Sequence, residues 1–433
     1  MGLGKTIQAL YWCYKTKKAR PIIVVCPAAV KYNWQREASK HLDMLSHVLE
    51  GRKATRIRRG SVPILILNYD ILSKWVPYLR ELDPRVVILD ECHAIKNLKS
   101  QRYEATKELC EGVKHVIAIS GTPLTNRPAE LWPTLNILLP HYYNSFFAFA
   151  FEFCRPRRMP WGGWNYGGAK NLAKLHEQLK EQCMIRRLKR QVLKELPDKV
   201  RTVVPVPLRD RGEYERASND FIGWLKQKSP GKAKRAMKAE AVTRIGYLLR
   251  LVARLKVRAV YDWVDNFLEE SDDKLVIFTR HTPMIRALEK HYGKKRIGWV
   301  TVDGGVTGRN RLHNVDRFRH DPDTRLFFGN IKAAGTGIDG LQEACSTALF
   351  VDLPWTPGDL VQAEDRLHRN GQKGATNIYY LIALNTIEEY LCELLQTKQK
   401  ILEQTLDGAA ESEEDTELSV LDTQEQLINH ISK

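Results

Sequence analysis

Short apolar runs alternate with helix-type patterns along most of the chain. Before Pro140 there are four such runs, each mostly β-branched and flanked by polar or turn residues: PIIVVC, SVPILILN, RVVILD and HVIAIS. Runs of this length and composition predict buried strands. Between them lie helical patterns such as AAVKYNWQREASKHL. Short buried strands that alternate with helices predict an α/β fold with a largely parallel sheet.

A second set of strand-like runs begins near Lys274. Its members are KLVIFT, IGWVTVDG, TRLFFGN, STALFVDLPW and TNIYYLIA. They are again short and apolar, as strands of a buried sheet are. Two α/β lobes with parallel sheets are therefore predicted, with helical insertions between them.

The region between the two sets differs in character. Residues 141–170 are aromatic and glycine-rich, which predicts an irregular insertion packed on the first lobe. The basic stretch KQKSPGKAKRAMKAE is either a solvated helix face or mobile loop, or a DNA-contacting face. The acidic run ESEEDTE after Gly408 predicts a flexible tail. The predicted organisation is a first lobe at 1–200, a helical insertion at 201–270, a second lobe with a C-terminal brace helix at 271–408 and an acidic tail at 409–433.

Composition narrows the class of protein. A chain of 433 residues with 43% hydrophobic content can form two or three domains with cores of their own. No apolar run approaches the ~20 residues of a membrane span, and no signal-peptide segment follows the N-terminus, so we expect an intracellular protein without a membrane partner. The eight cysteines form no CxxC pair, which argues against structural zinc and against a disulfide framework.

The net charge of +17 indicates a polyanionic partner whose binding weakens with salt. A generically basic protein without such a partner is the alternative that charge alone leaves open.

The first residues, MGLGKT, match the end of a phosphate-binding loop. In such a loop the backbone N–H groups around Gly2 and Gly4 surround phosphate oxygens, Lys5 reaches the β- and γ-phosphates, and the Thr6 hydroxyl binds Mg²⁺. The loop normally follows a strand. We therefore expect that the strand and the first turn precede residue 1 and that the sequence is truncated at its N-terminus.

The run RVVILDECHAIKN ends a predicted strand with two carboxylates. Asp90 is expected to hold Mg²⁺ through water, and Glu91 to orient the attacking water, with His93 within reach of both. A solvated acidic turn is the alternative for this run by itself. The upstream GKT favours the nucleotide site, which would bind ATP and Mg²⁺.

Two further segments follow strands. Ser120–Thr122, in HVIAISGTPLTN, lies at a strand end where an open α/β sheet builds its site, although an ordinary turn has the same composition. In QAEDRLHRNGQK, Arg366 and Arg369 share one helix face and could neutralise charge on a γ-phosphate; a surface helix is the alternative. Upstream, Gly335 and Gly337 stand at a sharp strand-to-helix turn, where the backbone can approach a partner closely.

In this order and spacing, the motifs resemble those of the Swi/Snf-type ATPases, a branch of the superfamily 2 helicase-like motors. The segments that carry the resemblance are MGLGKT, DECHAIKN, SGTPLTN and QAEDRLHRNGQK. The segments CMIRRLKRQVLKELPDK, DLPWTPGDLVQAEDR and TIEEYLCELLQTKQKILEQTLDG extend it to about Gly408. The pattern is most similar to the compact annealing-helicase or fork-remodelling branch and its phage or bacterial relatives.

The resemblance implies two RecA-like lobes that bind ATP between them and move along double-stranded or forked DNA with little base specificity. Asp90, Glu91, Arg366 and Arg369 would be catalytic, and Thr6 and Asp90 would hold the metal. The nucleotide would be bound by Gly2, Gly4, Lys5, Thr6, Gly337 and Asp339. DNA phosphates would be bound by Pro27, Ser120, Gly121, Thr122, Thr125, Thr279, Arg280, His281 and Gly335. The protein would act as a monomer, in the nucleoid or cytoplasm of a bacterial or phage system or in a eukaryotic nucleus.

The sequence also departs from the family pattern. The box reads DECH where alanine often takes the third position, and the glutamine-bearing segment that contacts adenine has no counterpart. Two alternatives to a translocase follow: a hydrolysis-deficient DNA-binding fragment, and a strand-separating DNA helicase.

Overall fold

The computed structural model divides the chain into two compact units. Unit 1 comprises Met1–Val192 and Ile401–Thr416, and unit 2 comprises Leu193–Lys400 and Glu417–Lys433. The structure describes residues 3–16, 19–51, 63–121, 123–124, 127–159, 163–227, 234–306, 308–335, 338–407 and 427.

Unit 1 is built on a five-stranded parallel sheet in the order β2-β3-β1-β4-β5. Its strands are β1 (Ile22–Cys26), β2 (Ser46–Val48), β3 (Ile64–Asn68), β4 (Val86–Asp90) and β5 (His115–Ile119). Four of them are the apolar runs that the sequence predicts, and only the short, half-exposed β2 was not foreseen. A pocket of about 910 Å³ beside the edge strand β5 is lined in part by Trp12, His115 and Ile117.

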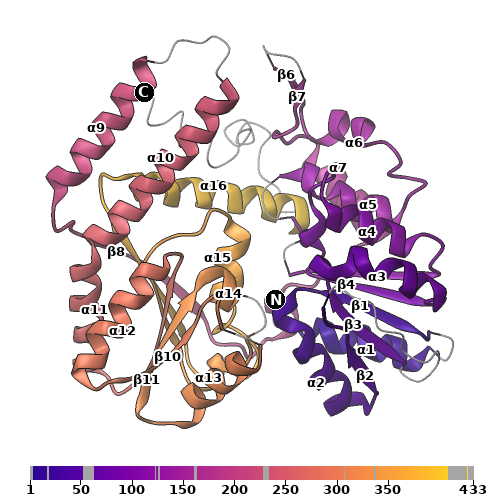
Figure 1. Cartoon of the computed structure of the whole chain (residues 1–433), viewed down its shortest axis with the longest axis horizontal. Helices are drawn as coiled ribbons and strands as arrows, with labels where there is room; N and C mark the ends of the chain where they lie inside the picture. The colour runs from indigo at the N-terminus through magenta and orange to yellow at the C-terminus, as the bar shows by residue number, and fades with distance from the viewer. Residues whose placement is uncertain are drawn as a thin grey trace. The chain divides into compact units, whose positions relative to one another are not determined.

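Helices cover both faces of this sheet (Figure 1). Successive side chains of a strand point to opposite faces, so Ile22 and Val24 of β1 join one core cluster while Ile23 and Val25 join another. The first cluster includes residues of α1 and α2, and the second includes residues of α3, α4 and α5. The helices of unit 1 are α1 (Lys5–Lys15), α2 (Lys31–Leu42), α3 (Tyr69–Glu81), α4 (Gln101–Cys110), α5 (Trp132–Leu138), α6 (Phe146–Phe153), α7 (Leu172–Gln182) and α8 (Lys189–Val192).

The aromatic segment at 141–170 contains helix α6 and a two-stranded antiparallel hairpin of β6 (Arg157–Arg158) and β7 (Trp164–Asn165). Ser145 caps α6, because its hydroxyl accepts the N–H of Ala148 at 3.3 Å. Phe149 and Phe153 are buried in the core cluster that α3 to α5 share. The segment therefore contributes part of its apolar side chains to the core of unit 1, while Phe147, Phe151 and Trp164 remain exposed.

Unit 2 is built on a six-stranded parallel sheet in the order β10-β11-β9-β12-β13-β8. Its strands are β8 (Lys199–Val206), β9 (Leu275–Thr279), β10 (Gly298–Val302), β11 (Thr324–Asn330), β12 (Thr347–Phe350) and β13 (Thr376–Ala383). The helical insertion is predicted to begin at residue 201, whereas the structure has strand β8 there. Two α/β units with parallel sheets confirm the predicted fold class.

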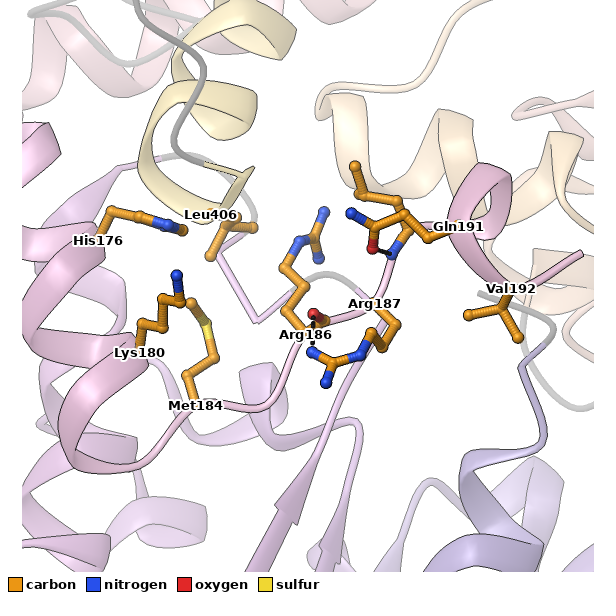
Figure 2. Close-up of a pocket in the computed structure, with 9 residues that line it drawn as sticks. His176, Lys180, Met184, Arg186, Arg187, Gln191, Val192 and Leu406 are labelled. Atoms are coloured by element: carbon orange, nitrogen blue, oxygen red, sulfur yellow. Dashed lines mark hydrogen bonds between the residues drawn. The ribbon is translucent and has the colours of Figure 1, made fainter.

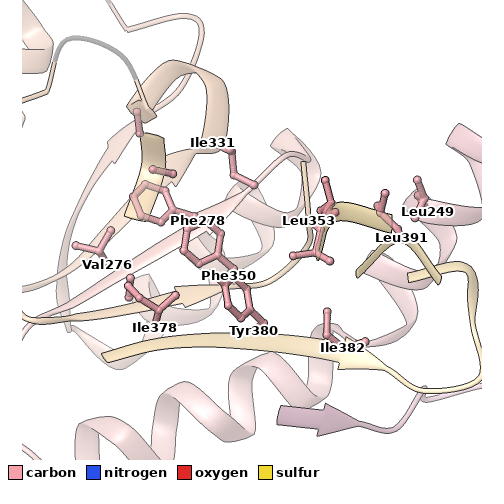
Figure 3. Close-up of a cluster of buried hydrophobic side chains, with 14 of the residues drawn as sticks. Leu249, Val276, Phe278, Ile331, Phe350, Leu353, Ile378, Tyr380, Ile382 and Leu391 are labelled. Carbon is pink, nitrogen blue, oxygen red and sulfur yellow. The ribbon is translucent and has the colours of Figure 1, made fainter. Parts of the chain in front are cut away.

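Neighbouring strands of unit 2 share an aromatic core (Figure 3). The ring centroids of Phe278 and Phe350 are 5.0 Å apart, and those of Phe350 and Tyr380 are 5.2 Å apart. These three residues come from the adjacent strands β9, β12 and β13, and their close ring packing holds the middle of the sheet together.

Helices also cover both faces of the second sheet. Val260 of α11 and Leu288 of α12 pack on one face, while Leu249 of α10 and Ala363 of α15 belong to the cluster on the other. The helices of unit 2 are α9 (Arg211–Gln227), α10 (Lys234–Leu255), α11 (Val257–Glu270), α12 (Thr282–Lys295), α13 (Gly308–His320), α14 (Ile331–Gly335), α15 (Pro357–Glu364) and the first part of α16 (Ile387–Asp407). Over the described ranges of both units, no helix is sufficiently long and apolar to cross a lipid bilayer.

A buried ion pair joins the start of α11 to the start of α16. The Lys256 ammonium donates to both carboxylate oxygens of Glu388, at 2.6 and 2.7 Å, and to Leu381 O at 2.8 Å. Both side chains are almost completely buried, with 0% and 1% exposure. Glu388 also accepts the N–H of Ala383 at 3.1 Å. The pair therefore connects three segments that are distant in sequence.

Candidate active site

In unit 1 the N-terminal glycine turn leads directly into helix α1. Gly4 has φ 68° and ψ 31°, a left-handed conformation that glycine adopts without a Cβ clash. Lys5 and Thr6 are the first residues of α1, and Gln8 N–H donates to Gly4 O at 3.0 Å. Because the first N–H groups of a helix lack intrahelical partners and carry positive charge, this end of α1 favours a phosphate group.

Asp90 ends strand β4 and is held by three neighbours. The indole N–H of Trp34, on α2, donates to Asp90 Oδ2 at 2.7 Å, and the N–H of Glu91 donates to Oδ1 at 3.0 Å. The hydroxyl of Tyr69 donates to the carbonyl of Asp90 at 2.8 Å. These bonds fix both the backbone and the carboxylate of Asp90, so its orientation depends on α2 and α3 as well as on β4.

Glu91 follows Asp90 in a left-handed conformation, with φ 48° and ψ 55°. A residue with a side chain pays a steric cost there, and such strain is found at functional sites. The Ser120 hydroxyl, just beyond β5, donates to Glu91 Oε2 at 3.2 Å. His93 Nδ1 lies 3.3 Å from the same oxygen and 3.3 Å from Ser120 Oγ. The loops after β4 and β5 therefore bring Glu91, His93 and Ser120 together, as the sequence led us to expect for His93.

Negative charge accumulates at Asp90 and Glu91. Burial of Asp90 and the adjacent charge of Glu91 raise the pKa of Asp90 to about 6, while the bond from Trp34 and the charge of Lys5 act in the opposite direction. A cation near these carboxylates would relieve their repulsion. Mg²⁺ usually keeps several waters and takes one or two carboxylates, so the Asp90 carboxylate is a ligand of the type that this ion takes. Over the described parts of the chain, no group of three or more His, Cys, Asp or Glu side chains forms a metal cage.

In unit 2 the two arginines of QAEDRLHRNGQK turn toward the loop after α14. Arg366 donates to Gly335 O at 3.0 and 2.5 Å, to Ile338 O at 2.7 Å and to Asp339 Oδ1 at 3.3 Å. Arg369 forms an ion pair with the same oxygen of Asp339. The structure therefore brings together Arg366, Arg369, Asp339 and Gly335. Two guanidinium groups share one carboxylate, and an anion at this position would compete with Asp339.

At the end of β9, Asp352 holds Thr279 and Arg280, and the Thr279 hydroxyl accepts the N–H of His281 at 3.1 Å. Thr279 is buried with 1% exposure, and its hydroxyl donates to Asp352 Oδ2 at 2.6 Å. Arg280 N–H donates to Asp352 Oδ1 at 2.7 Å, and its guanidinium lies 4.5 Å from the ring centroid of Trp355. Burial lowers the pKa of His281.

The remaining predicted DNA contacts lie at strand ends of unit 1. Pro27 directly follows β1 and is half-buried, as is Gly121, two residues beyond the end of β5. The carboxyl ends of parallel strands lie at one edge of the sheet, so both residues share that edge with Asp90. The predicted site residues outside the described residues are Gly2, Thr122, Thr125 and Gly337.

Comparison with known proteins adds the family. Residues 1–254 match the model of the SNF2-related domain, and residues 256–371 match the helicase conserved C-terminal domain. The chain belongs to the SNF2-related family. This membership confirms the resemblance to the Swi/Snf branch of helicase superfamily 2 that was inferred from the motifs.

Individual relatives of this SNF2-family chain agree with the assignment. It is 32% identical over 422 residues to "SWI/SNF-related matrix-associated actin-dependent regulator of chromatin subfamily A-like protein 1" of Xenopus laevis, covering 96% of this chain and 43% of the relative. It is also 32% identical over 423 residues to "DNA annealing helicase and endonuclease ZRANB3" of Homo sapiens, covering 95% and 38%. The chain thus spans less than half the length of these relatives. Among solved structures, the "Sulfolobus solfataricus SWI2/SNF2 ATPase core in complex with dsDNA" matches with a TM-score of 0.42 and 23% identity, covering 99% of this chain and 90% of that one.

Sequence reasoning missed three side chains that hold the SNF2 motifs in place. Trp34 and Tyr69 bond to Asp90, and Asp352 bonds to the loop after β9. Trp34 is the tryptophan of the helical run AAVKYNWQREASKHL, where periodicity indicates only a buried face. Asp352 follows the apolar run STALFV, so its position at a strand end was a usable signal.

A cationic pocket of about 450 Å³ in unit 1 is lined by the segment MIRRLK, which is part of the family resemblance (Figure 2). Lys180 of α7 and the arginines Arg186 and Arg187 supply its charge, and its other lining residues, His176 of α7 among them, are apolar or neutral. Leu406, near the end of α16, closes one side. None of the residues assigned to ATP or DNA binding from the motifs lines this pocket.

Proposed function

We propose that this chain hydrolyses ATP and uses the cycle to move along double-stranded or forked DNA. Membership of the SNF2-related family supports the ATPase part of the proposal. The net charge of +17 supports an anionic polymer as partner. A relative whose name contains "DNA annealing helicase" supports DNA as that polymer. On this proposal the protein acts as a monomer wherever that DNA is found, in a nucleus or in a bacterial or phage nucleoid.

The observation that carries the proposal is the cluster after β4 and β5. Glu91 accepts a bond from Ser120 and lies beside His93, next to the half-buried Asp90. In this proposal Lys5 and the N-terminus of α1 bind the β- and γ-phosphates. Glu91 orients the attacking water and receives its proton, while Ser120 holds the Glu91 carboxylate in position. When bound to Thr6 and Asp90, Mg²⁺ would supply neutralisation of phosphate charge.

The arginines of unit 2 complete the proposed site. Arg366 and Arg369 already face one carboxylate, that of Asp339. Under the proposal, a γ-phosphate replaces Asp339 as their partner when ATP is bound. Guanidinium groups at this place stabilise the charge that spreads over the phosphoryl oxygens in the transition state. In this proposal Arg366 and Arg369 bind Asp339 without ATP and the γ-phosphate with ATP. ATP binding therefore favours the state of unit 2 in which the arginines have released Asp339.

DNA would be held through its phosphates. Backbone and side-chain groups at the strand ends, at Pro27 and Gly121 of unit 1 and near His281 of unit 2, carry this role in the proposal. Phosphate contacts fix position without reading sequence, so we expect similar activity on duplexes of different sequence.

The test is ATP hydrolysis by the purified chain with and without duplex DNA. The proposal predicts stimulation by duplex DNA and a loss of about 100-fold or more in kcat for Lys5→Ala and for Glu91→Gln. Lys15→Ala, at the other end of the same helix α1, is the matched control and should hydrolyse ATP normally. Hydrolysis that persists in Lys5→Ala would falsify the assignment of the phosphate site.

Translocation is tested separately from hydrolysis. A motor on duplex DNA displaces a third strand from a triplex without separating the duplex, whereas a strand-separating helicase unwinds a forked duplex. DNA binding without any ATP hydrolysis would instead support the hydrolysis-deficient fragment. Each of the three functions thus has its own pattern of results.

A further inference from the structure

The turn that carries Arg366 and Arg369 is hydrogen-bonded to the segment at the start of unit 2, directly after the junction between the two units. Unit 2 begins at Leu193, and β8 begins at Lys199. In between, the ring Nε2–H of His368 donates to Pro197 O at 2.9 Å. His368 lies between Arg366 and Arg369 in sequence, so this bond joins the junction segment to the arginine turn itself.

Glu364 is the centre of a second, stronger connection. Its carboxylate receives a two-point bond from Arg201, with Nε to Oε1 at 2.9 Å and Nη2 to Oε2 at 2.6 Å. Lys199 donates to Glu364 Oε2 at 2.7 Å and to Asp365 at 3.3 Å. The hydroxyl of Tyr380, on β13, also donates to Oε1. Both cations belong to β8, the first strand after the junction, so the carboxylate links that strand to the end of α15.

This carboxylate is deeply buried yet charged. The Glu364 side chain is 1% exposed, and burial alone would raise its pKa, but Lys199 and Arg201 lower it below the usual value. A buried charge with this set of charge-assisted bonds has a fixed position, because movement away from Lys199 and Arg201 would leave it without its counter-ions. An exposed ion pair, by contrast, imposes little geometry.

The backbone of Glu364 also fixes the turn that carries the arginines. Its carbonyl accepts the N–H groups of Leu367 at 3.0 Å and His368 at 3.1 Å, which form the turn that contains Arg366. Arg366 is two residues beyond Glu364 and reaches Gly335 and Asp339 from this turn. A shift of Glu364 relative to β8 therefore shifts the base of the Arg366 side chain.

We propose that Glu364 is a positioning residue for ATP hydrolysis, which ties the arginine turn to β8 and so to the segment that joins the two units. Displacement of that segment is transmitted through Lys199 and Arg201 to Glu364, and from there to Arg366 and Arg369. This inference rests on the proposed function, because it assigns the arginines their role at the γ-phosphate. Glu364 itself touches neither nucleotide nor DNA in this scheme.

The test compares Glu364→Gln with the unmodified chain in DNA-stimulated ATP hydrolysis. The neutral amide keeps the size of the side chain but loses the two charge-assisted connections to β8. We expect kcat to fall by about tenfold or more, because misplacement of catalytic groups by a fraction of an ångström has effects of this size, while KM for ATP changes less than about twofold. Arg201→Met should reproduce the kcat loss from the other side of the connection.

Glu388→Gln is the matched control. Glu388 is equally buried, with 1% exposure, and paired with Lys256, but its bonds lead to α11 and β13 and not to the arginine turn. If Glu364 affected hydrolysis only by stabilising the fold, Glu364→Gln and Glu388→Gln would lose kcat in proportion to their loss of thermal unfolding temperature. We expect Glu388→Gln to retain kcat at temperatures where it is folded, whereas Glu364→Gln does not.

A double-mutant cycle with Arg366→Lys identifies the route. If Glu364 acts through Arg366, adding Glu364→Gln to Arg366→Lys lowers kcat by less than about twofold further, which is a non-additive result. Full additivity, or an unchanged kcat in Glu364→Gln, overturns the inference while leaving the proposed function intact. Absence of DNA-stimulated hydrolysis in the unmodified chain overturns both together.

Discussion

Lys256→Met tests how much the buried ion pair of unit 2 contributes to its fold. Methionine keeps the unbranched length of the lysine side chain and removes the ammonium group. Glu388 would then remain 1% exposed with Ala383 N–H as a bond donor and without its counter-ion. Leu381 O would lose the bond of 2.8 Å that it accepts from Lys256. The packing is retained, so the change isolates the charge.

The expected cost is large because both groups are out of water. Removing one partner of a buried ion pair costs about 3–5 kcal/mol in free energy of unfolding. An exposed pair of the same helix provides the scale: Arg258 and Asp262 of α11 lie 3.1 Å apart with 73% and 56% exposure. Arg258→Met should cost no more than about 0.5 kcal/mol. The stability cost of Lys256→Met should thus exceed that of Arg258→Met because the first ion pair is buried and the second is exposed.

The cost should also depend on pH. Burial already raises the pKa of Glu388, and Lys256 counteracts this, so Lys256→Met raises the folded-state pKa further above the unfolded value. A raised folded-state pKa gives stability that is fully present below the unfolded pKa and is lost as pH rises through the folded pKa. The deficit of Lys256→Met is therefore smaller at low pH than at neutral pH, by about 1.4 kcal/mol for each pKa unit of additional shift.

Urea unfolding of the whole chain at pH 5 and pH 8 measures these differences. The double variant Lys256→Met/Glu388→Gln should recover part of the loss, because it leaves no buried charge without a partner. A cost below about 1 kcal/mol at pH 8, or one that does not change with pH, would refute the reasoning that the pair is buried and charged.

Three further outcomes follow from local geometry. Ser100→Ala should lower stability by about 1 kcal/mol in thermal unfolding, because the Ser100 hydroxyl caps α4 by accepting Tyr103 N–H at 3.2 Å. Trp34→Phe should lower the kcat of ATP hydrolysis about tenfold, since the indole bond to the Asp90 carboxylate is lost; an unchanged kcat would show that this bond does not orient Asp90. In mass-spectrometric labelling of the native chain with a thiol reagent, Cys183 should react before the buried cysteines, because it is the exposed one among those described.

Apolar runs made most of both sheets predictable. Strands buried on both faces are continuous in hydrophobicity, as IIVVC of β1 and LVIFT of β9 are, so their positions along the chain could be inferred from sequence. Strand β8 was not predicted, because it is an edge strand whose side chains are mostly exposed, and polar residues and a proline interrupt its valines, so it forms no continuous apolar run. Its partner β13 lies more than 150 residues later, and no local pattern reveals such a pairing.

The chemistry of the site divides in the same way. Candidate site residues that stand at fixed places in a motif, such as Lys5, Asp90 and Glu91, could be chosen from sequence because the spacing of loop and strand ends is local. Residues that act through distant contacts could not be chosen. Glu364 is one position within a recognised motif, yet its contacts with Lys199 and Arg201 span more than 160 residues of chain.

The candidate site residues in each unit are held by hydrogen bonds within that unit. Asp90 accepts from Trp34 and Glu91 accepts from Ser120 in unit 1, and Arg366 donates to Gly335 and Asp339 in unit 2. Under the proposed function, ATP binding therefore replaces hydrogen bonds that these side chains already make within the protein by bonds to the nucleotide. A γ-phosphate that takes Arg366 from Asp339 replaces one charge-assisted bond by another, so its net energy is small compared with either bond alone. Since ADP has no γ-phosphate, only ATP can drive this exchange, and the two nucleotides should differ in their effect on unit 2 more than in their affinity for unit 1.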